Sequence, residues 1–232
     1  MLESDAAPVR AHRLRPAVAA GPRTLDRHLT ASRGAALQAA SRAAKQAFDR
    51  VLAALLLLTA LPILAAACLL VLLGDRSGPV LYRQTRVGRD GVEFGMWKLR
   101  TMRAATPERC AAANAPHKPR HDPRVTAPGR WLRRFSVDEL PQLINVLTGS
   151  MSLVGPRPHL PEEADRFDED ARARLLVRPG MTGLWQVSGR SELPWSEQLR
   201  LDLHYVEHWS LRLDLGILLR TAGAVLGGRG AY

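Results

Sequence analysis

The sequence contains few of the residues on which several large classes of protein depend. Its two cysteines, Cys68 and Cys110, cannot form the disulfide framework of a small secreted domain, so a reducing compartment fits best. Aromatic residues make up only 5% of the chain and do not alternate with the basic residues, as they would in a stacking platform for nucleic acid. The chain also has no Walker loop, no dinucleotide-binding fingerprint and no Gly-x-Ser-x-Gly elbow. It therefore lacks the signatures of P-loop, dinucleotide-binding and serine-hydrolase enzymes.

Positive charge, by contrast, is abundant and unevenly placed. The formal net charge is +11, which by composition alone favours nucleic acid or an anionic membrane surface as a partner. Residues 1–50 carry nine Lys or Arg against four acids, and residues 75–134 carry fourteen against five. Residues 135–232 carry ten against thirteen, so the C-terminal part is mildly acidic.

Between the two basic segments lies a run of 23 residues without a charged side chain, Val51 to Leu73. As one helix it would be about 34 Å long, enough to cover the roughly 30 Å hydrocarbon core of a bilayer. Pro62 at its midpoint removes a backbone hydrogen bond and favours a kink. Because Lys and Arg flank the run on both sides, a re-entrant helix that enters and leaves on the cytoplasmic face fits the positive-inside rule. A kinked single span is the alternative.

We divide the chain into three parts. Residues 1–44 show no sustained apolar periodicity and are expected to form a basic, disordered arm. Residues 45–76 are expected to form the re-entrant membrane helix as a helix-break-helix, and residues 77–232 a cytoplasmic domain. The expected fold class is α+β, mainly helical, with a small β-hairpin and interfacial amphipathic helices.

Residue patterns predict the elements of the cytoplasmic domain. Two extended runs around turn residues predict a hairpin with strands Val80–Val87 and Val92–Leu99. Apolar residues at i, i+3, i+4 and i+7 predict a helix over residues 140–147. Further helices are predicted over Pro161–Val177, Pro194–Trp209 and Leu211–Leu226, the last of which is apolar on most sides.

The densest polar segment spans residues 130–158. It places the adjacent carboxylates Asp138 and Glu139 just after Arg133 and Arg134, at the start of a predicted helix. A serine two residues before Asp138 also fits a capping box, which is a purely structural interpretation of Glu139. The functional interpretation is that two carboxylates facing several arginines beside a membrane suit metal-assisted chemistry on phosphate.

Other basic side chains strengthen the case for a phosphate-rich substrate. Arg157 lies between two prolines, so its stiff backbone can aim a guanidinium that binds phosphate through two hydrogen bonds. Arg178 lies beside a Pro-Gly turn, and Arg190 ends the same segment. Each of them alone is more often a surface charge. Together with Lys98 and Arg100, however, they favour binding of phosphate.

Six segments, in order, resemble the bacterial sugar transferases, the monotopic polyprenyl-phosphate phosphoglycosyl transferases. The resemblance covers residues 45–232 and is strongest to the short members that initiate exopolysaccharide synthesis with galactose or glucose phosphate. The segments are KQAFDRVLAALLLLTALPILAAACLLVLL, GPVLYRQTRVGRDGVEFGMWKLRTM, DPRVT, LRRFSVDELPQLINVLTGSMSLVGPRP, RPGMTGLWQVSGR and HYVEHWSLRLDLGILLRT.

The resemblance implies transfer of a hexose-1-phosphate from a UDP-sugar to undecaprenyl phosphate, with release of UMP. Such an enzyme is a phosphotransferase for substituted phosphate groups, acting first in exopolysaccharide or O-antigen synthesis. Asp138 would be the nucleophile and a Mg²⁺ ligand, with Glu139 completing the dyad. Arg133 and Arg157 would bind phosphate, and Pro62 would kink the re-entrant helix.

The resemblance also implies a place in the cell and a set of partners. The protein would lie in the bacterial inner membrane with its catalytic domain on the cytoplasmic face, without nucleic acid as a partner and with a homodimer as a candidate assembly. Two other classes stay open from the residues alone, a membrane-tethered nucleic-acid-binding protein and a non-catalytic membrane adaptor. The sugar is left open by the sequence.

Overall fold

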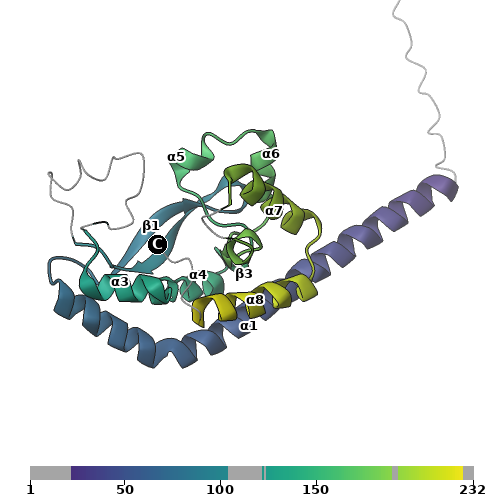
Figure 1. Ribbon diagram of the computed structural model, residues 1–232. Coiled ribbons are helices and arrows are strands. Elements are labelled where there is room, and N and C mark those ends of the chain that lie inside the picture. The colour runs from purple at the N-terminus through teal and green to yellow at the C-terminus, as the bar shows by residue number, and fades with distance from the viewer. Residues whose placement is uncertain (1–21, 104–121, 123, 190–192, 227–232) are drawn as a thin grey trace, which may run out of the picture. The chain divides into compact units, whose positions relative to one another are not determined.

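The computed structural model describes residues 22–103, 122, 124–189 and 193–226. The chain divides into two compact units, residues 1–43 and 44–232, and the candidate site belongs to the second. The α-helices and strands are α1 (Pro22–Gly74), β1 (Leu81–Val87), β2 (Glu93–Leu99), α3 (Ala127–Arg134), α4 (Gln142–Thr148), β3 (Ser152–Val154), α5 (Pro161–Ala164), α6 (Glu169–Arg172), β4 (Gly180–Thr182), α7 (Trp195–Glu207) and α8 (Leu211–Leu226). Short 3-10 helices are η1 (Arg89–Gly91), η2 (Val137–Glu139), η3 (Ala173–Leu176) and η4 (Trp185–Val187). This is the mainly helical α+β fold with a small hairpin that the sequence predicts (Figure 1).

Helix α1 carries the apolar run and, among the described residues, is the one helix long and apolar enough to cross a membrane. Only 17% of its most apolar stretch is buried, so most of that stretch is exposed. The helix is continuous through Pro62, and Figure 1 shows a bend in its C-terminal part where a break was expected. It begins at Pro22, inside the segment assigned to the basic arm. Residues 1–21 lie outside the described residues, so the disordered arm and the three-part division stay predictions.

Both halves of the apolar run pack against the same domain. Ala53, before the proline, belongs to a core cluster with residues of α4, β3, α7 and α8. Ala67 and Val71, after the proline, belong to a second cluster with Leu99 and Leu132 of β2 and α3. Small residues on this face let the helix approach closely. The remaining surface of the helix exposes large apolar side chains, including Leu55, Leu58, Leu61, Ile63, Leu69 and Leu73.

Polar contacts fasten the helix to the domain on both sides of the apolar run. On the N-terminal side, Lys45 Nζ lies 2.7 Å from Asp214 Oδ2, and the Ser152 hydroxyl donates to Asp49 Oδ2 at 2.7 Å. On the C-terminal side, Arg100 Nη1 lies 2.7 Å from an oxygen of the Asp75 carboxylate. A buried ion pair fixes geometry because each charge loses its water and depends on its partner.

The hairpin of β1 and β2 is confirmed, with each strand one residue shorter at its start than predicted. Its antiparallel register places Tyr82 opposite Lys98. Because side chains alternate between the faces of a strand, Gln84 and Arg86 lie on the same face as Tyr82. The turn uses positive φ angles, with Gly91 at 78°.

A second sheet, of β3 and β4, pairs two short strands in parallel, with Ser152 opposite Gly180. Next to this strand pair the two backbone segments approach each other so closely that a Cβ on Gly155 would lie 2.6 Å from the carbonyl oxygen of Arg178. This packing fixes the start of the loop 155–158 that carries Arg157.

The structure confirms two of the predicted helices and contradicts a third. Helices α7 and α8 confirm those predicted over residues 194–209 and 211–226. The single helix predicted over residues 161–177 is wrong, because the segment forms α5, α6 and η3. Asp168 starts a new helix by accepting a hydrogen bond from the Ala171 amide at 2.8 Å. The capping box is also wrong, since Ser136 adopts a φ of 54° and its side chain caps nothing.

We expect Asp214→Asn to destabilise the domain by about 1 to 3 kcal/mol, because it removes the nearer of the two carboxylates that face Lys45 Nζ, at 2.7 Å, and leaves only Asp49 at 3.5 Å. The Asp214 carboxylate also accepts hydrogen bonds from Tyr205 Oη at 2.8 Å and Trp209 Nε1 at 3.0 Å. Thermal unfolding in detergent measures the change. The control is Asp90→Asn, which removes an exposed pair with Arg89 and should cost less than about 1 kcal/mol. Equal melting temperatures for the two variants would contradict a role for Asp214 as the anchor of α1.

Candidate active site

The two carboxylates of the predicted dyad lie in η2, which follows α3 through a tight turn at Ser136. Val137 packs into the core beside α1 and holds η2 in place. Asn145 lies in α4, the helix that follows η2, and its side chain joins this helix to β2. The side chain accepts a hydrogen bond from the Trp97 amide at 2.9 Å and donates one to the Gly95 carbonyl oxygen at 2.9 Å. These bonds bring the dyad against the hairpin face that carries Lys98.

Glu139 is the paired member of the dyad. Its Oε1 atom accepts a hydrogen bond from Lys98 Nζ at 3.1 Å. Burial raises the pKa of Glu139, but the charges of Lys98, Arg157 and Arg86 outweigh burial and hold this pKa below its usual value. Glu139 is therefore ionised at neutral pH.

Asp138 has the opposite environment. The residue is 9% exposed, and burial together with the neighbouring Glu139 charge raises its pKa to about 6. Lys98 and Arg133 oppose this shift. Arg133 is itself oriented by a hydrogen bond from its Nε to Thr101 Oγ1 at 2.9 Å. Two adjacent carboxylates with pKa values pushed apart are typical of catalytic pairs, where each group has a different role.

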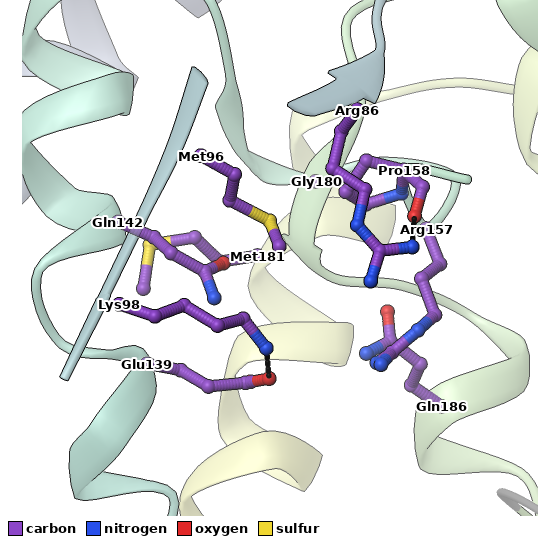
Figure 2. A pocket seen from close by; sticks show the side chains of 10 residues that line it. All are labelled: Arg86, Met96, Lys98, Glu139, Gln142, Arg157, Pro158, Gly180, Met181 and Gln186. Carbon is purple, nitrogen blue, oxygen red and sulfur yellow. Dashed lines mark hydrogen bonds and ion pairs between the residues drawn. The ribbon is translucent and has the colours of Figure 1, made fainter. Parts of the chain in front are cut away.

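A small pocket, open to solvent, adjoins the dyad. Figure 2 shows Lys98 and Glu139 on one side of it and Arg86, Arg157 and Gln186 on the other. The remaining lining residues are Met96, Gln142, Pro158, Gly180 and Met181. A pocket with three cationic side chains beside a carboxylate dyad suits a ligand with several negative charges.

The structure brings together only part of the predicted set. Lys98, Glu139 and Arg157 line the pocket, and Arg133 lies close enough to Asp138 to lower its pKa.

The other predicted arginines lie elsewhere. Arg100 does not line the pocket, because its guanidinium binds Asp75 and the Pro79 carbonyl oxygen. Arg134 is exposed, with its guanidinium 5.7 Å from the Phe135 ring centroid. Arg178 does not line the pocket either. Burial and the charges of Arg89 and Arg50 lower its pKa. Arg190 lies outside the described residues.

Sequence reasoning missed several residues of the site, namely Arg86, Gln142 and Gln186. A signal for Arg86 was present in the hairpin. Strand alternation places it on the same face as Tyr82, which the register sets opposite Lys98. Gln142 and Gln186 have no comparable signal, because the pocket they line forms only when α4 and η4 meet the hairpin.

The residues fit a hard divalent cation that also binds substrate. Asp138 forms no ion pair with any described residue, so its oxygens are available as ligands. Within the described ranges no group of three or more His, Cys, Asp or Glu side chains is arranged to hold a metal. Mg²⁺ is commonly bound by one or two carboxylates together with substrate phosphate oxygens and water, which this arrangement allows.

Comparison with known proteins agrees with this geometry. Residues 40–228 match the family described as bacterial sugar transferase. The chain is 42% identical to the undecaprenyl-phosphate galactose phosphotransferase of Salmonella typhimurium over 203 residues, which is 83% of this chain and 42% of that protein. It is 40% identical to the exopolysaccharide production protein ExoY of Rhizobium meliloti, covering 82% of this chain and 88% of that protein.

A third relative is the UDP-glucose:undecaprenyl-phosphate glucose-1-phosphate transferase of Escherichia coli K12. The identity is 39%, covering 84% of this chain and 43% of that protein. The chain thus spans less than half the length of some relatives and most of the length of others. From the matched family and these relatives, the chain belongs to the bacterial sugar transferase family.

Proposed function

We propose that the protein transfers a hexose-1-phosphate from a UDP-sugar to undecaprenyl phosphate and releases UMP. The names of the Salmonella and Escherichia relatives support the acceptor and the phosphotransfer, and the name of ExoY supports a role in making exopolysaccharide. The observation that carries the proposal is the carboxylate dyad beside a pocket with three cationic side chains. A nucleic-acid-binding or adaptor protein would need no such pocket.

The dyad supports a covalent route in two steps. An Asp138 oxygen attacks the phosphorus bonded to the sugar, and the bond to the bridging oxygen breaks, so that this oxygen leaves with the electron pair as UMP. An oxygen of undecaprenyl phosphate then attacks the same phosphorus and displaces the Asp138 carboxylate. Lys98 Nζ donates a hydrogen bond to Glu139 Oε1 at 3.1 Å and keeps this carboxylate ionised. Arg133 and Arg157 offset the negative charge of the phosphates.

Asp138 and substrate phosphate oxygens would hold Mg²⁺. When bound, the ion supplies positive charge next to the transferred phosphoryl group. The burial of Asp138 has a related effect, because a carboxylate with a pKa near 6 is a stronger nucleophile than an ordinary one yet is still ionised at neutral pH.

The contacts of α1 support a re-entrant topology at the bacterial inner membrane, with the catalytic domain on the cytoplasmic face. Lys45 and Asp75, on opposite sides of the apolar run, both pair with residues of one domain. A helix that crossed the bilayer would separate these two ends by the full hydrocarbon thickness. The exposed leucines of α1 and α8 would face lipid, while Pro62 provides the bend.

We expect Asp138→Asn to reduce turnover at least about a thousandfold, because the amide lacks the attacking charge. The assay follows UMP release from UDP-glucose or UDP-galactose with undecaprenyl phosphate and Mg²⁺. The matched control is Asp165→Asn, an exposed carboxylate at the end of α5, which should retain wild-type turnover. Near wild-type activity in the Asp138 variant would refute the nucleophile assignment.

Arg157→Lys tests whether the pocket binds phosphate through a planar guanidinium. The lysine keeps the charge but cannot form two parallel hydrogen bonds. We therefore expect kcat/KM to fall by a factor that corresponds to a loss of about 1 to 3 kcal/mol in transition-state binding. Arg166→Lys, at an exposed position, is the control. Equal kinetics for both variants would mean that general basicity suffices.

Topology is tested by labelling single cysteines on either side of the apolar run. Ser41→Cys and Ser77→Cys, both exposed, are placed in a background with Cys68 and Cys110 replaced by alanine. In spheroplasts, a membrane-impermeant maleimide should label neither cysteine until the membrane is permeabilised. Labelling of one cysteine alone in intact spheroplasts would demonstrate a spanning helix.

A further inference from the structure

Arg86 enters the pocket from β1 and is held there by neutral groups. Its Nη1 donates to the Pro158 carbonyl oxygen at 3.3 Å, and its Nη2 donates to Gln84 Oε1 at 3.0 Å. Its buried Nε has no hydrogen-bond partner among the described residues. The guanidinium is therefore oriented by its surroundings, but none of these partners neutralises its charge.

Three other half-buried or buried cations of this domain have carboxylate partners. Lys45 pairs with Asp214, Lys98 with Glu139, and Arg174 with Asp202. Within the part of the chain that the structure describes, neither Arg86 nor Arg157 forms an ion pair.

These two arginines lie on the same side of the pocket (Figure 2). Burial and the charge of Arg157 lower the pKa of Arg86 by more than the charges of Glu163 and Glu139 raise it, so the charge of Arg86 is only partly compensated in the unliganded protein. Placing two like charges together away from water costs free energy, and an anionic ligand between them removes that cost. The pair thus has the properties of an anion subsite.

The position of this subsite relative to the dyad indicates which anion it binds. Lys98 acts on both carboxylates of the dyad and Arg133 on Asp138, whereas Arg86 and Arg157 act on Glu139 and line the opposite wall of the pocket. A sugar nucleotide has two phosphates joined by one oxygen. If Asp138 attacks the phosphate that bears the sugar, the second phosphate lies farther from Asp138, toward the two arginines.

We propose that Arg86, together with Arg157, binds the phosphate of the departing UMP and then the phosphate of the incoming lipid acceptor in the same subsite. This inference rests on the proposed function. In phosphoryl transfer the attacking and leaving oxygens lie roughly in line with the phosphorus. The bridging oxygen of the donor leaves opposite Asp138. The lipid phosphate oxygen, which later displaces Asp138, must attack from that same side.

A subsite shared in this way requires the two ligands to bind in turn. In the first step the Asp138 oxygen–phosphorus bond forms, the bond from phosphorus to the bridging oxygen breaks, and UMP keeps the electron pair. In the second step a lipid phosphate oxygen bonds to the same phosphorus, and the Asp138 carboxylate is released with its electron pair. Arg86 donates hydrogen bonds to the charge on UMP as it leaves and then orients the attacking phosphate.

The first test compares binding of UMP and of uridine to Arg86→Gln, to Arg86→Lys and to wild type, by calorimetry in detergent. We expect the glutamine variant to bind UMP at least about tenfold more weakly and uridine, which lacks the phosphate, equally well. The lysine variant keeps the charge and should lie between the two. Arg83→Gln is the matched control from the same strand, because Arg83 is exposed and stacks on Trp97 with its guanidinium 4.1 Å from the ring centroid.

The second test separates the two half-reactions. Enzyme loaded with labelled sugar phosphate from UDP-glucose or UDP-galactose, freed of UMP, is mixed with undecaprenyl phosphate at several concentrations. We expect Arg86→Gln to need at least about tenfold more lipid for half-maximal discharge, matching its loss of UMP affinity.

The outcomes separate the inference from the proposed function. Unchanged UMP affinity in the glutamine variant, with normal wild-type turnover, would overturn the inference and leave the function standing. A weakened UMP interaction with unchanged lipid discharge would overturn the shared subsite. An equal loss of uridine and UMP affinity would assign Arg86 a structural role through Pro158 and overturn phosphate binding. Wild type that releases no UMP from any of a panel of UDP-hexoses, N-acetylated ones included, would overturn both proposals.

Discussion

The attachment of α1 to one domain on both sides of its apolar run is the constraint on which the other parts depend. Lys45 and Asp75 pair with Asp214 and Arg100, and Ala53 and Ala67 pack into clusters built from different elements of that domain. These contacts fix α3, α4 and α8 along the helix (Figure 1). They also place η2, and with it the dyad, close to an exposed apolar surface. In the proposed topology, the reacting groups therefore lie at the depth where a lipid phosphate meets water.

Electrostatics divides the site into regions with different tasks. Glu139 is neutralised by Lys98, while Asp138 is buried with less compensation and has a raised pKa. On the far wall, Arg86 and Arg157 have an excess of positive charge. An unliganded pocket with this distribution is under electrostatic strain that a diphosphate relieves. In the proposed reaction, the residues that destabilise the empty site would provide affinity for the sugar nucleotide and for the charge that develops during transfer.

Local patterns were sufficient to predict many elements and part of the site. The hairpin, α7, α8 and the apolar helix follow from periodicity and turn residues, which act over a few neighbouring positions. The adjacent carboxylates and Lys98 were recognisable because their chemistry is written in the side chains themselves. Arg157 was recognisable for a second reason, since two flanking prolines restrict its backbone wherever the chain goes.

Local residue patterns therefore account for the inventory of parts: an apolar run with a central proline, a hairpin, amphipathic helices, and a carboxylate pair among arginines. The contacts that each arginine makes depend on the tertiary structure. Arg100 binds Asp75 across 25 positions, while Arg86 meets the Pro158 carbonyl across 72. The division of residues 161–177 into short helices likewise depends on how that segment packs, including the Arg174 pair with Asp202. Such choices depend on distances between remote segments, and no local pattern encodes them.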